Sequence, residues 1–181
     1  VYVPLNFRLA PAELDYILAD ARAKIIFVGD ESLAQIVDRS QFSNDKVIFG
    51  KGGMSGWLKW ADFLAKGGAC DSLPVIGQDP QTTIYQMYTS GTTGKPKGVQ
   101  VSHEGVCAFI SSYVVMPNVI SAKKPHLAVA PLFHAASFSL VLAAISCGRP
   151  VVVMEAFEPT AVLDSIEREA IADILLVPAM L

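Results

Sequence analysis

A run of hydroxyl, glycine and lysine residues carries the most distinctive chemistry of the sequence. It reads YTSGTTGKPKGV from Tyr88 to Val99. Glycine lets the backbone adopt positive φ and approach a ligand closely, and Ser and Thr hydroxyls donate to phosphate oxygens. Successive backbone N–H groups in such a loop can form an anion-binding nest, and Lys95 and Lys97 add positive charge. The run therefore suits a polyphosphate ligand.

Two common phosphate or nucleophile motifs do not fit this run. A Walker A loop places Ser or Thr after Gly-Lys and opens a helix, whereas Gly94-Lys95 is followed by Pro96 and a strand pattern. No Gly-x-Ser-x-Gly nucleophile motif occurs. Composition alone leaves a Gly/Thr/Lys-rich surface hairpin without a ligand as the alternative.

The three histidines differ in what their surroundings indicate. His134 lies in PLFHAAS, either as a polar residue beside a ligand site or as a cap on the turn before a helix. His103 follows Ser102, a good N-cap, and is interpreted as structural. His126 has no assigned role.

Composition excludes several classes of protein. Of 181 residues, 52% are hydrophobic and 17% charged, which excludes global disorder. The net charge of −3 gives no basic field for nucleic acid. Three cysteines without a CxxC pattern exclude a disulfide scaffold and a zinc ribbon and favour a reducing compartment, so we expect a cytoplasmic protein. Cys107 and Cys147 fall on apolar helix patterns and are predicted core residues.

Hydrophobic periodicity alternates between short β-branched runs and helical patterns. Strands are predicted at 1–3, 24–28, 47–49, 83–88, 98–101, 126–130, 150–154 and 173–177. Helices are predicted from Pro11, at 32–37, 57–64, after Ser102, and at 136–147 and 159–169. Trp57 and Trp60, three residues apart, are expected to pack on one helix face.

These elements predict an α/β fold with a mostly parallel sheet flanked by helices. The last third alternates β-α-β-α-β with apolar strands, as parallel sheets covered on both faces do. Only nine residues separate the strands around the polar loop, so this pair is predicted antiparallel, with Thr89–Lys97 as an exposed connecting loop. The expected organisation is 1–65 as a first α/β segment, 66–80 as a linker, and 81–181 as the hairpin and βαβαβ segment.

The stretch from Leu127 to Cys147 contains no Lys, Arg, Asp or Glu over 21 residues, the length of a membrane span. Pro131, His134 and several serines interrupt it. A strand, a turn and a buried helix are therefore predicted in place of an integral membrane span, which stays the alternative.

The ends of the sequence are apolar. It opens on VYVPLN without an initial Met and closes on ILLVPAML. Because termini normally lie at the surface, we expect a piece of a larger fold; a complete small domain with buried ends is the alternative.

Three stretches resemble the adenylate-forming (AMP-binding) superfamily of acyl- and aryl-CoA synthetases, firefly-type luciferases and peptide-synthetase adenylation domains. YTSGTTGKPKGV is similar to the family's phosphate-binding signature, VYVPLNFRLAPAELDYIL to an earlier segment, and PLFHAAS to a motif at the rim of the acyl pocket. The resemblance covers nearly the whole chain. It implies part of the large N-terminal domain of an adenylate-forming enzyme, most similar to a bacterial fatty-acyl-CoA synthetase.

The resemblance also implies a reaction and its residues. A carboxylate attacks the α-phosphate of ATP, pyrophosphate leaves, and the thiol of coenzyme A then displaces AMP from the acyl-adenylate. The residues that would hold ATP phosphates are Thr89, Ser90, Gly91, Thr92, Thr93, Gly94 and Lys97. Lys97 and His134 are the expected catalytic residues, and Lys95 occupies a variable position of the signature.

Other family elements are absent from the sequence. It lacks the Tyr-Gly-x-Thr-Glu-like string whose Glu holds Mg²⁺, the Asp that binds ribose and the C-terminal catalytic Lys, so no metal ligand is named and the isolated chain is expected to be inactive. PLFHAASFSL suits an apolar acyl chain, while Asn6 departs from the Asp usual in peptide synthetases. An aryl-CoA ligase and a non-catalytic ATP-binding module stay open, as does a homodimer.

Overall fold

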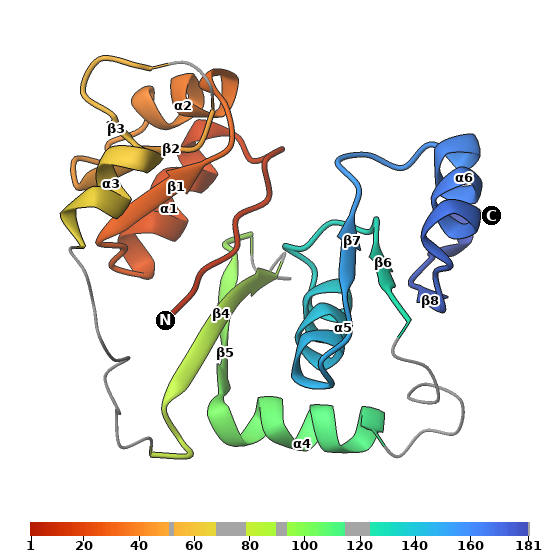
Figure 1. Cartoon of the computed structure of the whole chain (residues 1–181). Coiled ribbons are helices and arrows are strands. Elements are labelled where there is room, and N and C mark those ends of the chain that lie inside the picture. The colour runs from red at the N-terminus through yellow and green to blue at the C-terminus, as the bar shows by residue number, and fades with distance from the viewer. Residues whose placement is uncertain (51–52, 68–78, 90–93, 115–123, 181) are drawn as a thin grey trace. The chain divides into compact units, whose positions relative to one another are not determined.

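The computed structural model describes residues 1–50, 53–67, 79–89, 94–114 and 124–180 (Figure 1). The helices are α1 (Pro11–Asp20), α2 (Glu31–Asp38), α3 (Trp60–Lys66), α4 (His103–Val114), α5 (Ala135–Ser146) and α6 (Pro159–Glu169), with a 3₁₀ turn η1 at Pro178–Met180. The strands are β1 (Ile25–Val28), β2 (Asp45–Ile48), β3 (Leu58–Lys59), β4 (Thr83–Thr89), β5 (Lys97–Ser102), β6 (His126–Ala128), β7 (Val151–Val153) and β8 (Asp173–Ile174).

The chain forms two compact units. The α1 unit comprises Leu5–Gln78 and Tyr88–Val99, and the α5 unit comprises Val1–Pro4, Asp79–Met87 and Gln100–Leu181. The boundary crosses the β4–β5 hairpin, so the tip of the hairpin belongs to the α1 unit and its base to the α5 unit.

The α1 unit is built on a parallel sheet in the order β1-β2-β3. Alternation along β1 directs Ile26 and Val28 to the core, while Phe27 is 41% exposed. The core consists of Leu14, Leu18, Ile26, Val28, Ala34, Val37, Ile48 and Trp57. Helix α2 begins where the carboxylate of Asp30 accepts a hydrogen bond from the Leu33 N–H at 2.9 Å, an N-cap that satisfies an otherwise unpaired donor.

The predicted helix at 57–64 is wrong at its start. Trp57 precedes β3, is buried, and donates its indole N–H to the carboxylate of Asp38. Trp60 begins α3 and packs in an aromatic cluster with Phe27, Phe49 and Phe63. Trp57 therefore packs in the core and Trp60 in the aromatic cluster, because the chain between them is an extended strand rather than a helical turn.

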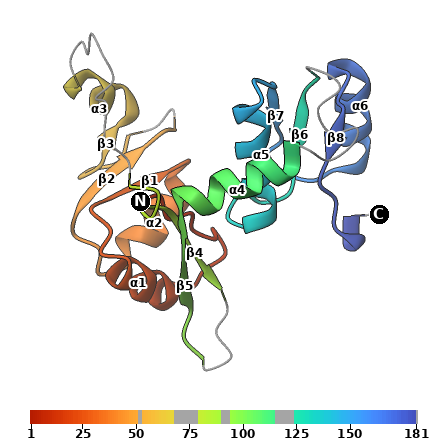
Figure 2. The same ribbon diagram turned by 90° about the horizontal axis from the view of Figure 1, so that it is seen from below.

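The α5 unit contains a parallel sheet in the order β7-β6-β8. Helix α6 packs on it through Val162 and Ile166 against Leu127 and Val129, and α5 contacts β6 and β7. Both helices flank the sheet in Figure 2. This β-α-β-α-β arrangement confirms the parallel fold predicted for the last third. The strand predicted at 173–177 is wrong beyond Ile174, where the chain leaves the sheet toward η1.

The charge-free stretch 127–147 forms a strand, a turn and a helix, as predicted. Ser137 of α5 is polar but buried, and the hydrogen bond that its hydroxyl donates to the Ala130 carbonyl at 2.7 Å offsets the cost of burying it. Within the residues that the structure describes, no helix is long and apolar enough to cross a membrane.

Some details of the polar hairpin and its surroundings differ from expectation. Strands β4 and β5 are paired and run in opposite directions (Figures 1 and 2), but Thr89 and Lys97 are the end residues of the strands rather than loop residues. The predicted first strand is a single bridge between Tyr2 and Tyr85. Cys107 is exposed rather than core, because α4 turns that face outward, and Cys147 is half-buried.

Candidate functional site

The β4–β5 hairpin carries the described residues of the signature from Tyr88 to Val99. Tyr85, Gln86 and Met87 are buried in β4, and the strand becomes exposed at Thr89. Lys97 begins β5 on an exposed stretch. The Thr89 hydroxyl and the Lys97 ammonium therefore come from the two strand ends that flank the connecting residues. Ser90, Gly91, Thr92 and Thr93 lie outside the described residues.

Gly94 has a backbone conformation that explains its residue type. Its φ is +90°, in the region that L side chains rarely adopt, and among the described residues no atom lies within 4 Å of a Cβ built there. The glycine is needed for backbone geometry rather than to relieve crowding.

The hairpin tip contacts one face of α1. The Tyr88 hydroxyl donates to the Asp20 carboxylate at 2.6 Å, and the Lys95 ammonium lies 5.5 Å from the centre of the Tyr16 ring. Tyr16 and Asp20 are one turn apart on α1, so they share a face. These contacts were missed by sequence reasoning because Tyr88 and Asp20 are 68 positions apart.

His134 belongs to the α5 unit, whereas Tyr88–Val99 belong to the α1 unit. It is the N-cap residue of α5, and its backbone carbonyl accepts a hydrogen bond from the Phe138 N–H at 3.1 Å. Its imidazole makes no capping hydrogen bond, is exposed, and contacts the Phe133 ring. The capping alternative for the His134 side chain is therefore wrong, and the imidazole faces solvent.

Ser102 and His103 form the helix start that the sequence predicts. The Ser102 hydroxyl accepts a hydrogen bond from the Gly105 N–H at 3.2 Å, which caps α4. The His103 N–H donates to the Thr82 carbonyl, and its ring lies 3.7 Å from the Cys107 sulfur. These contacts place both residues at the start of α4, and the structural role of the His103 side chain stays a prediction.

A polar network at the strand starts of the β7-β6-β8 sheet was not predicted. Asp173 accepts hydrogen bonds from His126 at 3.0 Å and Tyr113 at 2.9 Å, and forms an ion pair with Arg149. Burial opposes ionisation of Asp173, but the hydrogen bonds from Arg149, His126 and Tyr113 outweigh it and hold its pKa below the usual value. The sequence signal for this network was a polar residue at the start of an apolar strand.

The glycine after α5 positions Arg149 for this network. Gly148 has φ of +68°, its N–H donates to the Ile145 carbonyl, and the Arg149 N–H donates to the Ala144 carbonyl. This is a Schellman motif, which ends the helix and turns the chain toward β7.

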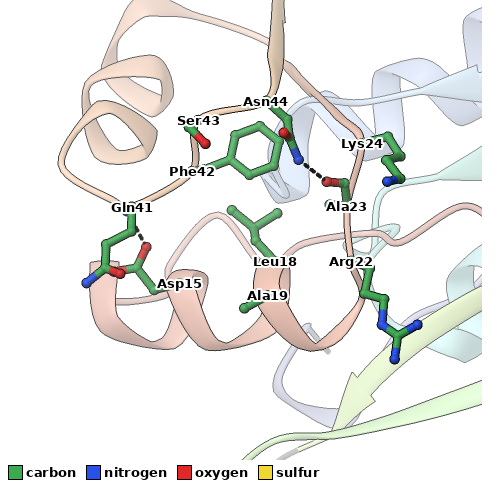
Figure 3. Close-up of a pocket in the computed structure, with 10 residues that line it drawn as sticks. All are labelled: Asp15, Leu18, Ala19, Arg22, Ala23, Lys24, Gln41, Phe42, Ser43 and Asn44. Atoms are coloured by element: carbon green, nitrogen blue, oxygen red, sulfur yellow. Dashed lines mark hydrogen bonds between the residues drawn. The ribbon is translucent and has the colours of Figure 1, made fainter.

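A pocket of about 460 Å³ lies at the end of α1 but contains none of the predicted site residues (Figure 3). Its walls are held by a hydrogen bond from the Gln41 N–H to Asp15 at 2.6 Å and by one from the Asn44 amide to the Ala23 carbonyl at 2.8 Å. These two hydrogen bonds pair some of the polar groups that line the pocket.

The chain belongs to the AMP-binding enzyme family, whose model matches residues 1–181. It is 35% identical to an indoleacetate–CoA ligase of Aromatoleum aromaticum, over 100% of this chain and 36% of that protein. It is 33% identical to the long-chain-fatty-acid–CoA ligase FadD13 of Mycobacterium tuberculosis, over 100% of this chain and 35% of that protein. It thus spans about a third of the length of these relatives.

Solved structures agree with the fold. The N-terminal domain of FACL13 from M. tuberculosis, crystallised with an inhibitor, matches with a TM-score of 0.80 and 30% identity, over 98% of this chain and 44% of that chain. The fold is therefore that of part of the N-terminal domain of adenylate-forming enzymes.

Proposed function

We propose that the full-length protein containing this chain activates a carboxylic acid with ATP. The carboxylate oxygen attacks the α-phosphorus, giving an acyl-adenylate and pyrophosphate, and the coenzyme A thiol then displaces AMP to form a thioester. The observation that carries this proposal is the family match over residues 1–181, which includes the complete signature from Tyr88 to Val99.

The hairpin residues have chemistry suited to the phosphate groups. Thr89 can donate its hydroxyl, and Lys97 its ammonium, to phosphate oxygens from the two strand ends. Ser90, Gly91, Thr92 and Thr93 are assigned by the signature alone, and Gly94 by its positive φ and open surroundings. Their role is to stabilise negative charge that builds up on the departing pyrophosphate. His134 is proposed to lie beside the acyl or nucleotide site.

Mg²⁺ would supply further charge neutralisation when bound with ATP. In the described part of the chain, no group of three or more His, Cys, Asp or Glu side chains could hold a metal ion. The residues described here do not form such a site, and no step is derived through the ion.

A fatty acid is the proposed substrate. The segment from Pro131 into α5 is rich in apolar and small residues, which suits an aliphatic chain, and one relative is a long-chain-fatty-acid–CoA ligase. The competing proposal is an aromatic acid, favoured by the indoleacetate–CoA ligase relative. Both proposals share the adenylation step and differ in the acid pocket.

Detection of the thioester product distinguishes these proposals. The full-length protein is incubated with ATP, Mg²⁺, coenzyme A and a panel of aliphatic and aromatic acids, and products are identified by mass spectrometry. We expect AMP and acyl-CoA from medium- or long-chain fatty acids. Thioesters from aromatic acids alone would make the protein an aryl-CoA ligase, and ATP binding without product would favour a non-catalytic module.

A further inference from the structure

We propose that Tyr16 and Asp20 of α1 are positioning residues for the phosphate-binding hairpin, a proposal that rests on the proposed function. The first observation is that both ends of the hairpin tip contact this one helix face. Tyr88 donates to Asp20 at 2.6 Å, and the Lys95 ammonium lies 5.5 Å from the Tyr16 ring centre, within cation–π range. The tip accordingly belongs to the same compact unit as α1, apart from the base of its own strands.

The positions of these contacts relate them to the ligand-binding groups. Tyr88 immediately precedes Thr89, and Lys95 lies two residues before Lys97. An anchor one or two residues away restricts where the Thr89 hydroxyl and the Lys97 ammonium can point, because a strand advances only about 3.3 Å per residue. Fixing both before ATP binds reduces the conformational entropy lost on binding.

A carboxylate at position 20 is unfavourable for helix α1 considered by itself. It is the last residue of the helix, where the negative end of the helix dipole disfavours a carboxylate. Its hydrogen bond from Tyr88 supplies a reason for an acidic residue there. Asp15, on the same helix, instead accepts a hydrogen bond from the Gln41 N–H and does not take part in the hairpin contacts described.

The two lysines of the signature then have separate roles. Lys95 directs its ammonium to the Tyr16 ring and holds the tip, which leaves Lys97 as the lysine for phosphate. Replacing Lys95 by Arg keeps a cation that can stack on an aromatic ring. Replacing it by Met removes the cation while keeping much of the side-chain length.

The test compares Asp20→Ala and Tyr88→Phe in the full-length protein. Because each deletes the same hydrogen bond, we expect each to raise the KM for ATP in acid-dependent pyrophosphate exchange about three- to tenfold. The double variant should be no worse than either single variant. The KM for the acid and the melting temperature should stay at wild-type values. Asp20→Asn, which keeps an acceptor oxygen, should recover most of the loss.

Asp15→Ala is the matched control, since it removes a hydrogen-bonded carboxylate from the same helix away from the hairpin. Amide hydrogen exchange of residues 94–99 is measured in parallel and should be faster in Asp20→Ala than in Asp15→Ala.

Two failures can be told apart. A wild-type KM for ATP in Asp20→Ala, in an active protein, would overturn the positioning role and leave the proposed function standing. A wild-type protein inactive with every acid would overturn the proposed function. In that case hydrogen exchange alone tests whether Asp20 holds the hairpin tip against α1. Faster exchange in Asp20→Ala than in Asp15→Ala would support this contact, and equal rates in the two variants would contradict it.

Discussion

Lys97 is the residue whose replacement should affect adenylation most directly among the described residues. Lys97→Ala in the full-length protein is expected to slow pyrophosphate exchange about 10- to 150-fold, since a hydrogen bond to a charged group contributes about 1.5–3 kcal/mol. Because the side chain is exposed, the free energy of unfolding should change by no more than about 0.5 kcal/mol. An exchange rate equal to wild type, beside an unchanged thermal melt, would remove Lys97 from the phosphate site.

His134 occupies the N-cap position of α5, where His is a poor capping residue, and its imidazole is exposed. Asn is a preferred N-cap, and the His134 side chain makes no capping bond, so His134→Asn should stabilise the protein by about 0.5–1 kcal/mol. If the imidazole contacts the acyl or nucleotide site, the same variant should raise the KM for the acid or for ATP. Thermal melts and steady-state kinetics measure the two effects. Unaltered kinetics with a raised melting temperature would remove the His134 imidazole from the acyl or nucleotide site.

Residue types in one short segment could be interpreted from the sequence, whereas side-chain pairs distant along the chain could not. The signature from Tyr88 to Val99 indicates phosphate chemistry because hydroxyls, glycines and lysines occur together within it. The contact of Tyr88 with Asp20 depends on how the chain folds back over 68 positions. The roles of the signature residues and of His134 stay predictions.

The elements around Asp173 are joined by charge as well as by packing. Asp173 in β8 accepts hydrogen bonds from Tyr113 of α4 and His126 of β6. It also forms an ion pair with Arg149, which lies in the turn before β7. Arg149 is 2% exposed and Asp173 is 30% exposed, so loss of the carboxylate would leave a buried guanidinium without its counter-charge.

Asp173→Asn should therefore destabilise the protein by about 2–3 kcal/mol, less than the 3–5 kcal/mol typical of fully buried pairs because Asp173 is partly exposed. The folded-state pKa of Asp173 is lowered, so this stabilisation is fully present above the unfolded pKa of about 4 and is lost as pH falls through the folded value. Urea unfolding of wild type and variant at several pH values measures this. Equal stabilities at pH 7 would contradict the account.

Strongly periodic elements were predicted well because their period is set locally. The helix from Pro11 and the α5 and α6 helices match their predicted ranges closely. The misses are short: β3 has two residues, and β8 ends at Ile174. Such strands form by pairing with a neighbour rather than through their own sequence pattern, which is why a helix was predicted over Trp57.

At the scale of the whole molecule, the chain matches only part of the length of its relatives. It spans 36% of an indoleacetate–CoA ligase and 44% of a solved N-terminal domain. The division into 1–65, 66–80 and 81–181 stays a prediction, as do a cytoplasmic location and a homodimer. The structure groups the hairpin tip with the α1 unit instead of with the rest of its strands, a long-range feature that no local pattern indicates.

Acid-dependent exchange of labelled pyrophosphate into ATP tests the central claim most directly, because it reports the adenylation step without requiring coenzyme A. The full-length protein should exchange label with a medium- or long-chain fatty acid and show only background without an acid. The isolated chain of residues 1–181 should show background in both cases, because it lacks the Mg²⁺-binding Glu and the C-terminal Lys that the family resemblance implies. Absence of exchange by the full-length protein with every carboxylic acid tested would contradict the assignment of this fold and hairpin to carboxylate activation.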